Sequence, residues 1–337
     1  MKRYSSIWIL ILAFYSFSTK AQDIHFSQFY NSPLTLNPAQ TGVFNGDYRF
    51  AGNYRNQWNS VTIPFSTFSM SGDMKNALGV KNLGLGIVFN HDNTGDSRFR
   101  TTVFNVSGSY GIDLDESSKQ QLTFGIQTGF TNKNLSYDEL KFDAQYNGLA
   151  FNGGLPNREN FNTSKQNFFN LHSGVNYVNT IGNREVFQAG IGVFNLTKPK
   201  ESYFNNQAIE VDRRISIYAN YQVPITNEID ILPATFFMKQ GKYFEYIIGA
   251  RGKYILSEAA GAVQSAYLGL FFRTKDAGFI TAEYDYNNWH FGLSYDINLS
   301  TLRQASNGRG GIELSAIYIL RKIKPSSNKY KRCPDYI

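Results

Sequence analysis

The stretch "WHFGLSYDINL", residues 289–299, decides the fold class because its apolar and polar residues alternate without a break. Every second residue is apolar, and this set comprises Trp289, Phe291, Leu293, Tyr295, Ile297 and Leu299. The positions between them are occupied by His290, Gly292, Ser294, Asp296 and Asn298. A period of two is that of a β-strand whose two faces meet unlike surroundings. A soluble sandwich and a membrane barrel both contain such strands, so the pattern predicts a strand and leaves open which face meets water.

The composition extends this prediction to the whole chain. The 337 residues include 28 Phe, 22 Tyr and 29 Gly but one Cys, and 18% of them are charged. A chain rich in aromatic residues and glycine and poor in charge is typical of many strands joined by tight turns. This length suits either two domains or one large barrel, and the composition favours the barrel.

Fourteen segments after residue 44 have the character of strands. Their approximate limits are 46–58, 65–75, 82–93, 97–114, 120–137, 167–179, 185–196, 214–225, 229–240, 243–256, 266–274, 277–286, 289–302 and 311–320. Most have about the ten residues that a tilted strand needs to cross a bilayer. The sequence therefore predicts an all-β, transmembrane antiparallel outer-membrane β-barrel of about fourteen strands, within a range of about twelve to sixteen. A secreted soluble β protein is the alternative.

The connections provide a second test, because outer-membrane barrels have short periplasmic turns and longer outer loops. With the amino terminus inside, the two longest connections, 138–166 and 197–213, fall outside, and the short connection 226–228 falls inside. Two connections depart from this rule: 257–265 is a long inner turn and 275–276 is a very short outer loop.

Residues 1–21 predict a cleavable secretory signal. Lys2 and Arg3 precede a short apolar core, and Ala21 is a small residue suited to the cleavage site. The core is too short to favour the alternative, an uncleaved anchor helix, and no later run reaches the roughly 18 apolar residues of a transmembrane helix. We therefore expect cleavage near Ala21 and a mature protein in the outer membrane of a Gram-negative bacterium.

The formal net charge of +7 comes from the two ends of the chain. Loss of the signal with its three basic residues leaves +4, and the tail 321–337 holds six basic residues and one acid, so the body carries −1. A basic tail of this kind does not indicate a nucleic-acid-binding domain, and we expect no nucleic-acid partner. The single Cys333 lies in this tail and is expected to be a free thiol.

The segment 22–45 shows no strand alternation and is rich in Asn and Pro. A fourteen-strand barrel is too wide for its own side chains to close, so we expect this segment to fold into the lumen as a plug. The barrel then covers 46–320, and 321–337 forms a periplasmic tail. Within the plug, Asn and Pro favour a turn over a contact with a partner. The residues of this predicted turn are Asn37, Pro38 and Ala39.

The start of the mature chain resembles the PorP/SprF family of outer-membrane proteins of the type IX secretion system. The segments "FSQFYNSPLTLNPAQTG", "YRNQW" and "PFSTFSMSGD" carry the resemblance, which is sharp over about 22–75 and architectural beyond it. The matching residues are Phe26, Ser27, Gln28, Asn37, Pro38, Ala39, Gly42, Tyr54, Arg55, Gln57, Trp58, Ser69 and Asp73.

The resemblance implies a barrel without enzymatic activity or cofactor that works with the secretion machinery. Its expected partners are outer-membrane lipid, subunits of the type IX machinery and a large secreted, gliding-type adhesin that it helps to secrete or to attach to the cell surface. The "NPA" element is also similar to the start of FadL-like fatty-acid transporter barrels. That similarity supplies the alternative function, transport of a hydrophobic small molecule across the outer membrane.

Several polar residues are expected to face the lumen. They are Arg49, Arg55, Gln57, Glu283, Asp285, His290 and Asp296. For Arg55 a hydrogen-bonding role in the lumen is favoured over direct recognition of a partner. The three acids and His290 suit a metal or acid–base cluster, but satisfied interior charges are the favoured interpretation. No HxxxH, GxSxG or GxxxxGK spacing is present, so the sequence indicates no catalytic, metal or cofactor site.

Two regions are candidates for partner binding. The outer loop is more aromatic than a spacer requires, and its candidate residues are Tyr146, Phe151 and Phe161. The tail suits either a solvated anchor for anionic headgroups or a periplasmic docking peptide. Its candidate residues are Arg321, Lys322, Tyr330, Arg332 and Tyr336.

Overall fold

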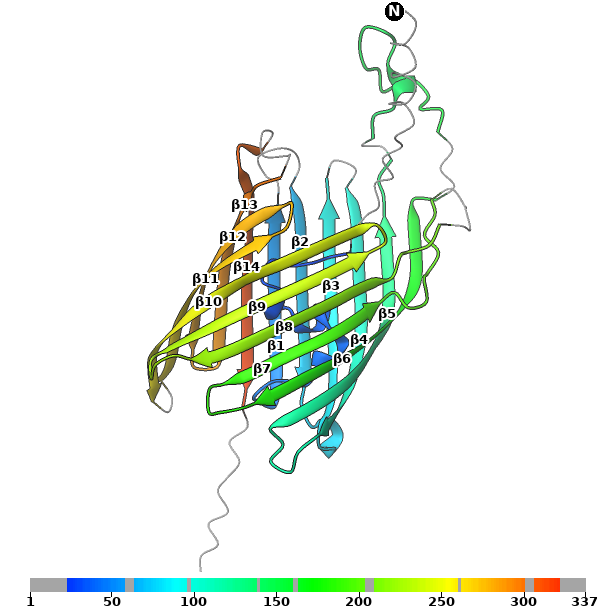
Figure 1. Ribbon diagram of the computed structural model, residues 1–337. Coiled ribbons are helices and arrows are strands. Elements are labelled where there is room, and N and C mark those ends of the chain that lie inside the picture. Colours follow the sequence, from blue (N-terminus) through cyan, green and yellow to red (C-terminus); the bar gives the residue numbers. More distant parts are fainter. Residues whose placement is uncertain are drawn as a thin grey trace, which may run out of the picture.

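The computed structural model describes residues 23–57, 64–95, 98–137, 140–159, 163–203, 209–259, 262–300 and 306–321. Over these ranges the chain forms one closed barrel in which consecutive strands are neighbours (Figure 1). No helix within them is long and apolar enough to cross a membrane.

The first seven strands are β1 (Tyr48–Gln57), β2 (Phe65–Met74), β3 (Leu83–Thr94), β4 (Phe99–Asp113), β5 (Gln120–Asn134), β6 (Lys165–Thr180) and β7 (Val186–Phe194). The next seven are β8 (Arg214–Pro224), β9 (Ile229–Gln240), β10 (Tyr243–Ala259), β11 (Ala262–Arg273), β12 (Ala277–Tyr286), β13 (Trp289–Asn298) and β14 (Arg309–Leu320). The short helices are η1 (Phe29–Asn31), α2 (Pro33–Leu36), η2 (Pro38–Gln40), η3 (Ala77–Gly79) and η4 (Asp143–Gln145).

The barrel closes where β1 pairs antiparallel with β14. The register of this closing pair runs from Tyr48 opposite Leu320 to Gln57 opposite Gly311. Closure gives each of the fourteen described strands a partner on both edges, which removes the edges that would otherwise pair with other chains. The prediction of an antiparallel barrel of about fourteen strands is confirmed, and the strand limits differ from the predicted ones by a few residues.

The prediction of a long inner turn at 257–265 is wrong. β10 continues to Ala259 and β11 begins at Ala262, so the two strands are joined at 260–261. A β-bulge between Ile255 and Ser257 interrupts the register of this pair. Because a bulge shifts the alternation by one residue, it hides the continuation of a strand from a period-two reading.

The two ends of the barrel differ in their connections. At one end, here the inner end, β1 begins, β14 ends, and turns such as 114–119 and 225–228 are short. The other, outer end carries the long connections 135–164 and 195–213, and part of the first projects beyond the strands in Figure 1. This arrangement matches the short periplasmic turns and longer outer loops of outer-membrane barrels.

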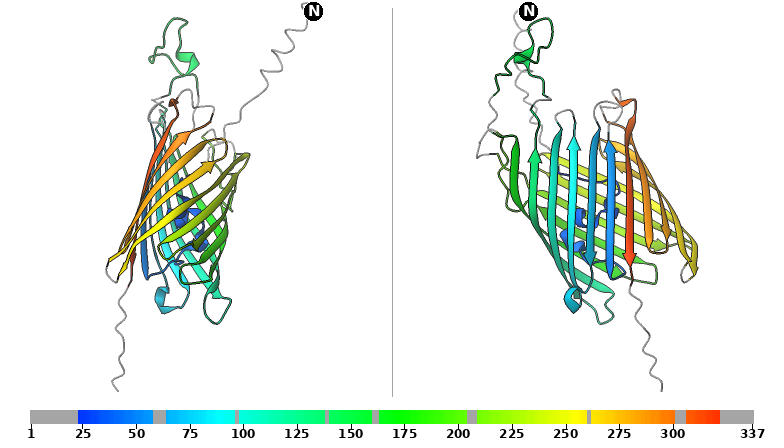
Figure 2. Two further views of the ribbon diagram at one scale, coloured as in Figure 1. Left: turned by 60° about the vertical axis from the view of Figure 1, so that its left-hand side comes forward. Right: turned by 180° about the vertical axis from the view of Figure 1, so that it is seen from behind.

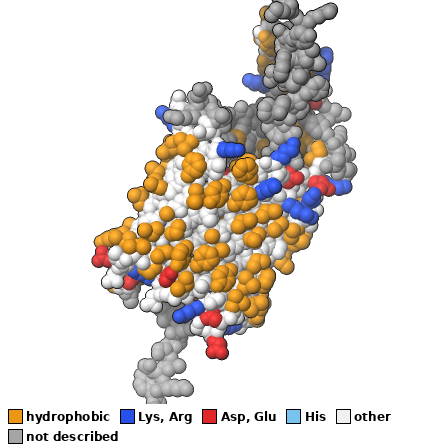
Figure 3. All heavy atoms as spheres, in the orientation of Figure 1, with side chains coloured by type: hydrophobic (Ala, Val, Ile, Leu, Met, Phe, Trp, Pro, Cys, Tyr) orange, Lys and Arg blue, Asp and Glu red, His pale blue; other side chains and the backbone are white. Residues whose placement is uncertain are grey.

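The outer surface of the wall is apolar and its inner surface is polar. On β13, Phe291 and Leu293 are exposed on the outside, whereas Ser294 and Asp296 are buried in the lumen. Figure 3 shows hydrophobic side chains across the visible wall, with most Lys, Arg, Asp and Glu toward its ends. The apolar face of the stretch 289–299 therefore faces lipid, as expected for a membrane barrel.

The lumen is not empty. The helices η1, α2 and η2 and the chain around them lie inside the barrel, where both views of Figure 2 show them between the walls. This N-terminal segment, residues 23–47, is called the plug below.

Candidate functional site

The plug runs through the lumen from the outer to the inner end. At the outer end, the backbone N–H of Asp23 donates to Oε1 of Gln240, the last residue of β9, at 2.9 Å. Near the inner end, the N–H of Gly42 donates to Oδ2 of Asp73, at the end of β2, at 2.7 Å. The plug is therefore attached to the wall close to both ends of the barrel.

The predicted turn at Asn37, Pro38 and Ala39 is buried in the plug. Asn37 Oδ1 accepts a hydrogen bond from the N–H of Ala39 at 2.9 Å and so caps η2. Its Nδ2 donates to the carbonyl of Val175 on β6 at 2.9 Å. Asn37 thus forms the turn and also attaches it to the wall.

Glycines in the wall make room for this turn. A Cβ on Gly174 would lie 1.9 Å from Asn37 Oδ1, and a Cβ on Gly125 would lie 2.4 Å from the backbone nitrogen of Ala39. Any other residue at either position would collide with the plug, so the close approach of plug and wall requires glycine.

A carboxylate on β14 holds the first turn of the plug. Glu313 Oε2 accepts the backbone N–H of Ser27 at 2.7 Å, and Oε1 accepts that of Gln28 at 2.8 Å. Arg55 Nε lies 3.8 Å from the same carboxylate. Glu313 is 1% exposed, so its charge is balanced inside the lumen rather than by water.

Arg55 and Asp296, two of the predicted lumen residues, belong to the same group. Arg55 Nη2 lies 3.1 Å from Asp296 Oδ2, and Arg273 Nη1 lies 3.0 Å from the same oxygen. Arg55 also donates to the backbone carbonyl of His25 at 2.8 Å. The two guanidinium groups therefore join β1, β11 and β13 to the plug.

Arg49 anchors the inner part of the plug. Its Nε and Nη2 donate to the two carboxylate oxygens of Asp73 at 2.9 and 2.7 Å. Nη2 also donates to the carbonyl of Gln40 at 2.9 Å. Gln57, the remaining predicted lumen residue on β1, lies near the outer end and lines the cavity described below.

A second group surrounds Glu283 on β12. Arg251 Nη1 lies 2.8 Å from Glu283 Oε2, and Tyr30 of the plug donates to Oε1 at 2.6 Å. His290 Nδ1 lies 2.7 Å from Asp285 Oδ1. Asp296, the fourth residue of the predicted cluster, belongs instead to the group around Arg55. Within the described ranges, no group of three or more His, Cys, Asp and Glu side chains is arranged to hold a metal ion.

Apolar side chains complete the attachment on the side of β8–β12. Phe29 stacks on Phe236 with 5.2 Å between ring centroids, and Phe271 meets Phe29 edge to face at 6.5 Å. Leu36 and Met238 belong to the same buried cluster. The plug thus packs into an apolar core on one side and forms hydrogen bonds with polar groups of the wall elsewhere, as a segment of a folded domain does.

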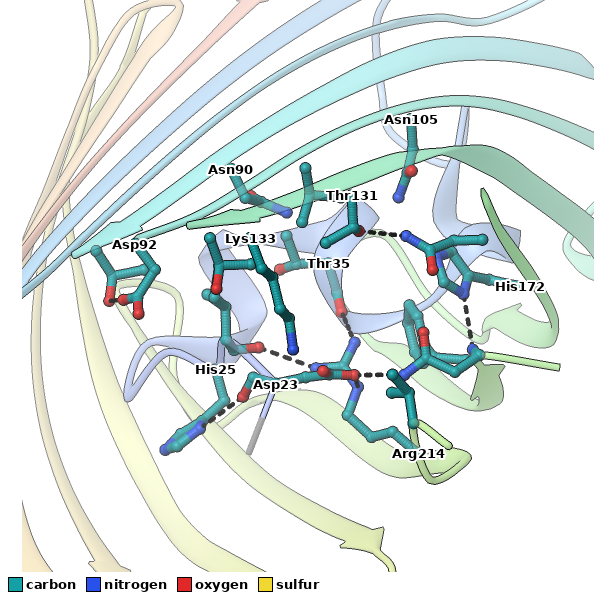
Figure 4. A pocket seen from close by; sticks show the side chains of 18 of the residues that line it. Asp23, His25, Thr35, Asn90, Asp92, Asn105, Thr131, Lys133, His172 and Arg214 are labelled. Atoms are coloured by element: carbon teal, nitrogen blue, oxygen red, sulfur yellow. Dashed lines mark hydrogen bonds and ion pairs between the residues drawn. The ribbon is translucent and has the colours of Figure 1, made fainter. Parts of the chain in front are cut away.

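On the opposite side, a cavity of ≈ 360 Å³ lies between the plug and the outer halves of β1–β8 (Figure 4). Asp23, His25 and Thr35 of the plug line it, and Lys133 and Arg214 reach into it from the wall. Burial lowers the pKa of His25, although the Glu245 carboxylate 3.2 Å from its Nε2 opposes that shift.

The candidate partner residues lie at the two ends of the barrel. Tyr146 and Phe151 of the outer loop form an isolated bridge and are exposed, and Leu149 between them is 92% exposed. Arg321 Nε donates to the carbonyl of Asn45 at 3.1 Å. The other candidates lie outside the described residues, as does the predicted signal, and they are Phe161, Lys322, Tyr330, Arg332 and Tyr336.

The sequence reading missed several residues that hold the plug. The charged ones are Glu245, Arg251, Arg273, Arg214 and Glu313, and the glycines are Gly84, Gly125 and Gly174. Each of them is a charged residue or a glycine at a position of an alternating strand that faces the lumen. This pattern is visible in the sequence. The stretch "LGLG", residues 83–86, carries the same pattern, since a Cβ on Gly84 would lie 2.4 Å from the carbonyl oxygen of Thr41.

Residues 18–318 match the family described as type IX secretion system membrane protein PorP/SprF. None of the curated proteins compared matches the chain.

Solved structures with a similar fold are membrane barrels of low sequence identity. The toluene transporter TbuX of Ralstonia pickettii has a TM-score of 0.46 and 8% identity over 85% of this chain and 92% of that chain. The CymD monoaromatic hydrocarbon channel has a TM-score of 0.48 and 9% identity over 87% and 93%. A FadL homologue of Pseudomonas aeruginosa has a TM-score of 0.46 and 11% identity over 86% and 94%. These likenesses concern the fold alone.

Proposed function

Because the chain belongs to the PorP/SprF family of type IX secretion system membrane proteins, we propose that it is a protein-binding partner in the outer membrane. It contacts subunits of the secretion machinery and assists the secretion or surface attachment of a large adhesin-type protein. It acts by docking and carries out no chemical reaction.

The observation that carries this proposal is the attachment of the plug at both ends of the lumen. The Asp23–Gln240 and Gly42–Asp73 contacts hold its ends, and Glu313 holds its first turn. A folded or extended protein chain cannot pass through a lumen occupied in this way unless these buried contacts break. The barrel therefore contacts its protein partners through its outer surfaces.

The outer loop offers such a surface. Tyr146, Leu149 and Phe151, called the loop tip below, are exposed by 56%, 92% and 45%. Exposed apolar side chains in a loop beyond the bilayer favour protein contact, because neither lipid nor a core covers them. The aromatic rings supply contact area at a low cost in side-chain entropy.

The test is a complementation experiment read by proteomics of the cell surface. A strain without the barrel is expected to lose one or a few large secreted proteins from its surface, and the wild-type barrel is expected to restore them. Leu149→Ser is expected to restore them poorly. Leu78→Ser is the matched control, since Leu78 is 85% exposed but lies at the inner end.

The alternative, transport of a hydrophobic solute, predicts a different result in the same strains. Surface proteins are then unchanged, and uptake of an apolar compound falls when the barrel is absent. The cavity lining is mixed, because an apolar solute would meet Asp23, Lys133 and Arg214 there beside four phenylalanine rings.

A further inference from the structure

The outer cavity lies on the β1–β8 side of the plug, and of the ion pairs that fix the plug to β9–β14 it borders that of His25 with Glu245. Its wall comes from neighbouring strands, and Asn90 on β3, Asn105 on β4 and Asn170 on β6 each contribute an amide. Its volume of ≈ 360 Å³ lies within the range of small-molecule sites. It is therefore a candidate binding site in its own right.

The three amides have unused hydrogen-bonding capacity. The side-chain oxygens of Asn90, Asn105 and Asn170 are buried and have no hydrogen-bond partner among the described residues. These residues are 8%, 3% and 3% exposed. Since buried polar groups are nearly always paired, these three amides of the cavity lining are candidates to pair with a polar ligand once they rotate toward it.

Electrostatic balance argues against a charged ligand. Asp23 Oδ2 lies 3.9 Å from Arg214 Nε, and Lys133 Nζ lies 2.8 Å from Glu201 Oε1. Asp92 accepts hydroxyl hydrogen bonds from Thr67 at 2.6 Å and from Thr94. Apart from Arg214 Nε, which has no hydrogen-bond partner among the described residues, these charged groups are held by neighbours, and an ionic ligand would have to displace them.

Aromatic rings form the remaining wall of the cavity. Phe65, Phe99, Phe168 and Phe194 line it beside the amides. A purely apolar ligand would contact these rings but leave the amides unpaired. A ligand with hydroxyl groups on an apolar ring satisfies both, because a hydroxyl donates and accepts and an amide can present either atom by rotation.

We propose that the outer cavity binds a neutral saccharide unit. The amides of Asn90, Asn105 and Asn170 bind its hydroxyl groups, and the phenylalanine rings pack against its C–H face. The cavity lies in the outer half of the lumen, toward the side on which free sugars and the glycans of the cell surface occur. This binding does not depend on the proposed role in secretion.

Calorimetric titration of the purified full-length mature barrel in detergent tests the proposal. The neutral probes are glucose, N-acetylglucosamine, maltose and the polysaccharide purified from the surface of the same cells. The comparison probes are glucose 6-phosphate, toluene and a blocked Gly-Ser-Gly peptide. Binding of a small neutral sugar indicates a free ligand, whereas binding of the polysaccharide alone indicates a surface glycan, and either result supports the proposal.

Asn90→Leu is expected to weaken saccharide binding by about tenfold, the effect of one or two lost hydrogen bonds. Asn53→Leu is the matched control, because Asn53 is a buried asparagine whose amide nitrogen has no partner in the described part of the chain and which does not line this cavity. If Asn90→Leu does not fold, Val103→Trp, which fills the cavity from its wall, is expected to abolish binding. Failure of every neutral sugar to bind, or binding of the peptide, phosphate or toluene probe in their place, overturns the proposal.

Discussion

Asn37 in the plug and Gly174 in β6 lie so close together that a Cβ at position 174 would be 1.9 Å from the Asn37 amide oxygen. The wall is thus shaped to the turn that fills it. This close fit, together with the contacts of Glu313 and Asp73, makes the plug an integral part of the barrel.

Replacement of Gly174 tests the fit directly. Gly174→Val is expected to destabilise the protein by about 1–3 kcal/mol, as overpacking does in a filled core. Urea unfolding of the purified barrel measures this change, and planar-bilayer conductance reports whether the plug has moved. Gly252→Val is the matched control, because its new Cβ would meet only the Leu268 carbonyl oxygen, at 4.0 Å. Equal stability of the two variants would contradict the close fit.

Removal of one acceptor oxygen of Glu313 is expected to loosen the first turn of the plug. Glu313→Gln keeps the shape but places an amide NH2 against the backbone N–H of Ser27 or Gln28, and a buried N–H left unpaired costs about 1–3 kcal/mol. Urea unfolding gives the stability, and limited proteolysis gives the exposure of the plug. Glu258→Gln is the control, because Glu258 Oε1 lies 4.0 Å from Arg184 Nη1 in an exposed ion pair. This variant is expected to lose less than about 0.5 kcal/mol of stability. A Glu313→Gln barrel as stable as the control would rule out the anchoring role.

The partly buried His25 predicts a pH dependence of plug attachment. Burial lowers its pKa in the folded protein below the ordinary value of 6.5, so at mildly acidic pH the unfolded chain binds more protons than the folded one. The contribution of His25 to stability is therefore complete above pH 6.5 and falls as the pH drops below it.

Urea unfolding at about pH 7.5 and about pH 5.5 measures this effect. His25→Asn is expected to lose less stability between these two conditions than the wild type does. His91→Asn, a change in the wall outside the plug, is the control and is expected to keep the wild-type difference. A His25→Asn variant with the full wild-type pH dependence would show that another group titrates.

Truncation of the tail separates folding from docking. A chain that ends at Arg321 retains β14 to Leu320 and the Arg321–Asn45 hydrogen bond, so we expect it to fold and to migrate as a compact barrel on an unheated gel. We also expect it to lose secretion-machinery subunits during co-purification, because the tail carries Tyr330 and Tyr336 beyond what solubility requires. Unchanged recovery of these subunits with the truncated chain would contradict docking by the tail and indicate a solvated anchor.

Strand alternation was sufficient to predict the barrel, because each face of a strand such as β13 meets one kind of surroundings. It failed most clearly near Ile255, where a bulge shifted the period, and it misplaced several strand ends by a few residues. The turn at Asn37 was also predictable, since the tendency of Asn and Pro to form turns is local.

The contacts that hold the plug were not predictable, because they join residues far apart in the sequence. Ser27 and Glu313 are separated by 286 positions, and Arg55 and Asp296 by 241. An inward charge or glycine is visible in a strand pattern, but its partner depends on how the plug is folded in the lumen. For the same reason the outer cavity has no signature in the sequence.

The most direct test of the central claim is recovery of the tagged barrel from its own outer membrane in mild detergent, followed by mass spectrometry. We expect type IX secretion subunits and a large secreted protein to be recovered with the wild type and with Leu78→Ser, and to be depleted with Leu149→Ser. A barrel recovered alone or with only lipid-like molecules bound would contradict the account and favour transport.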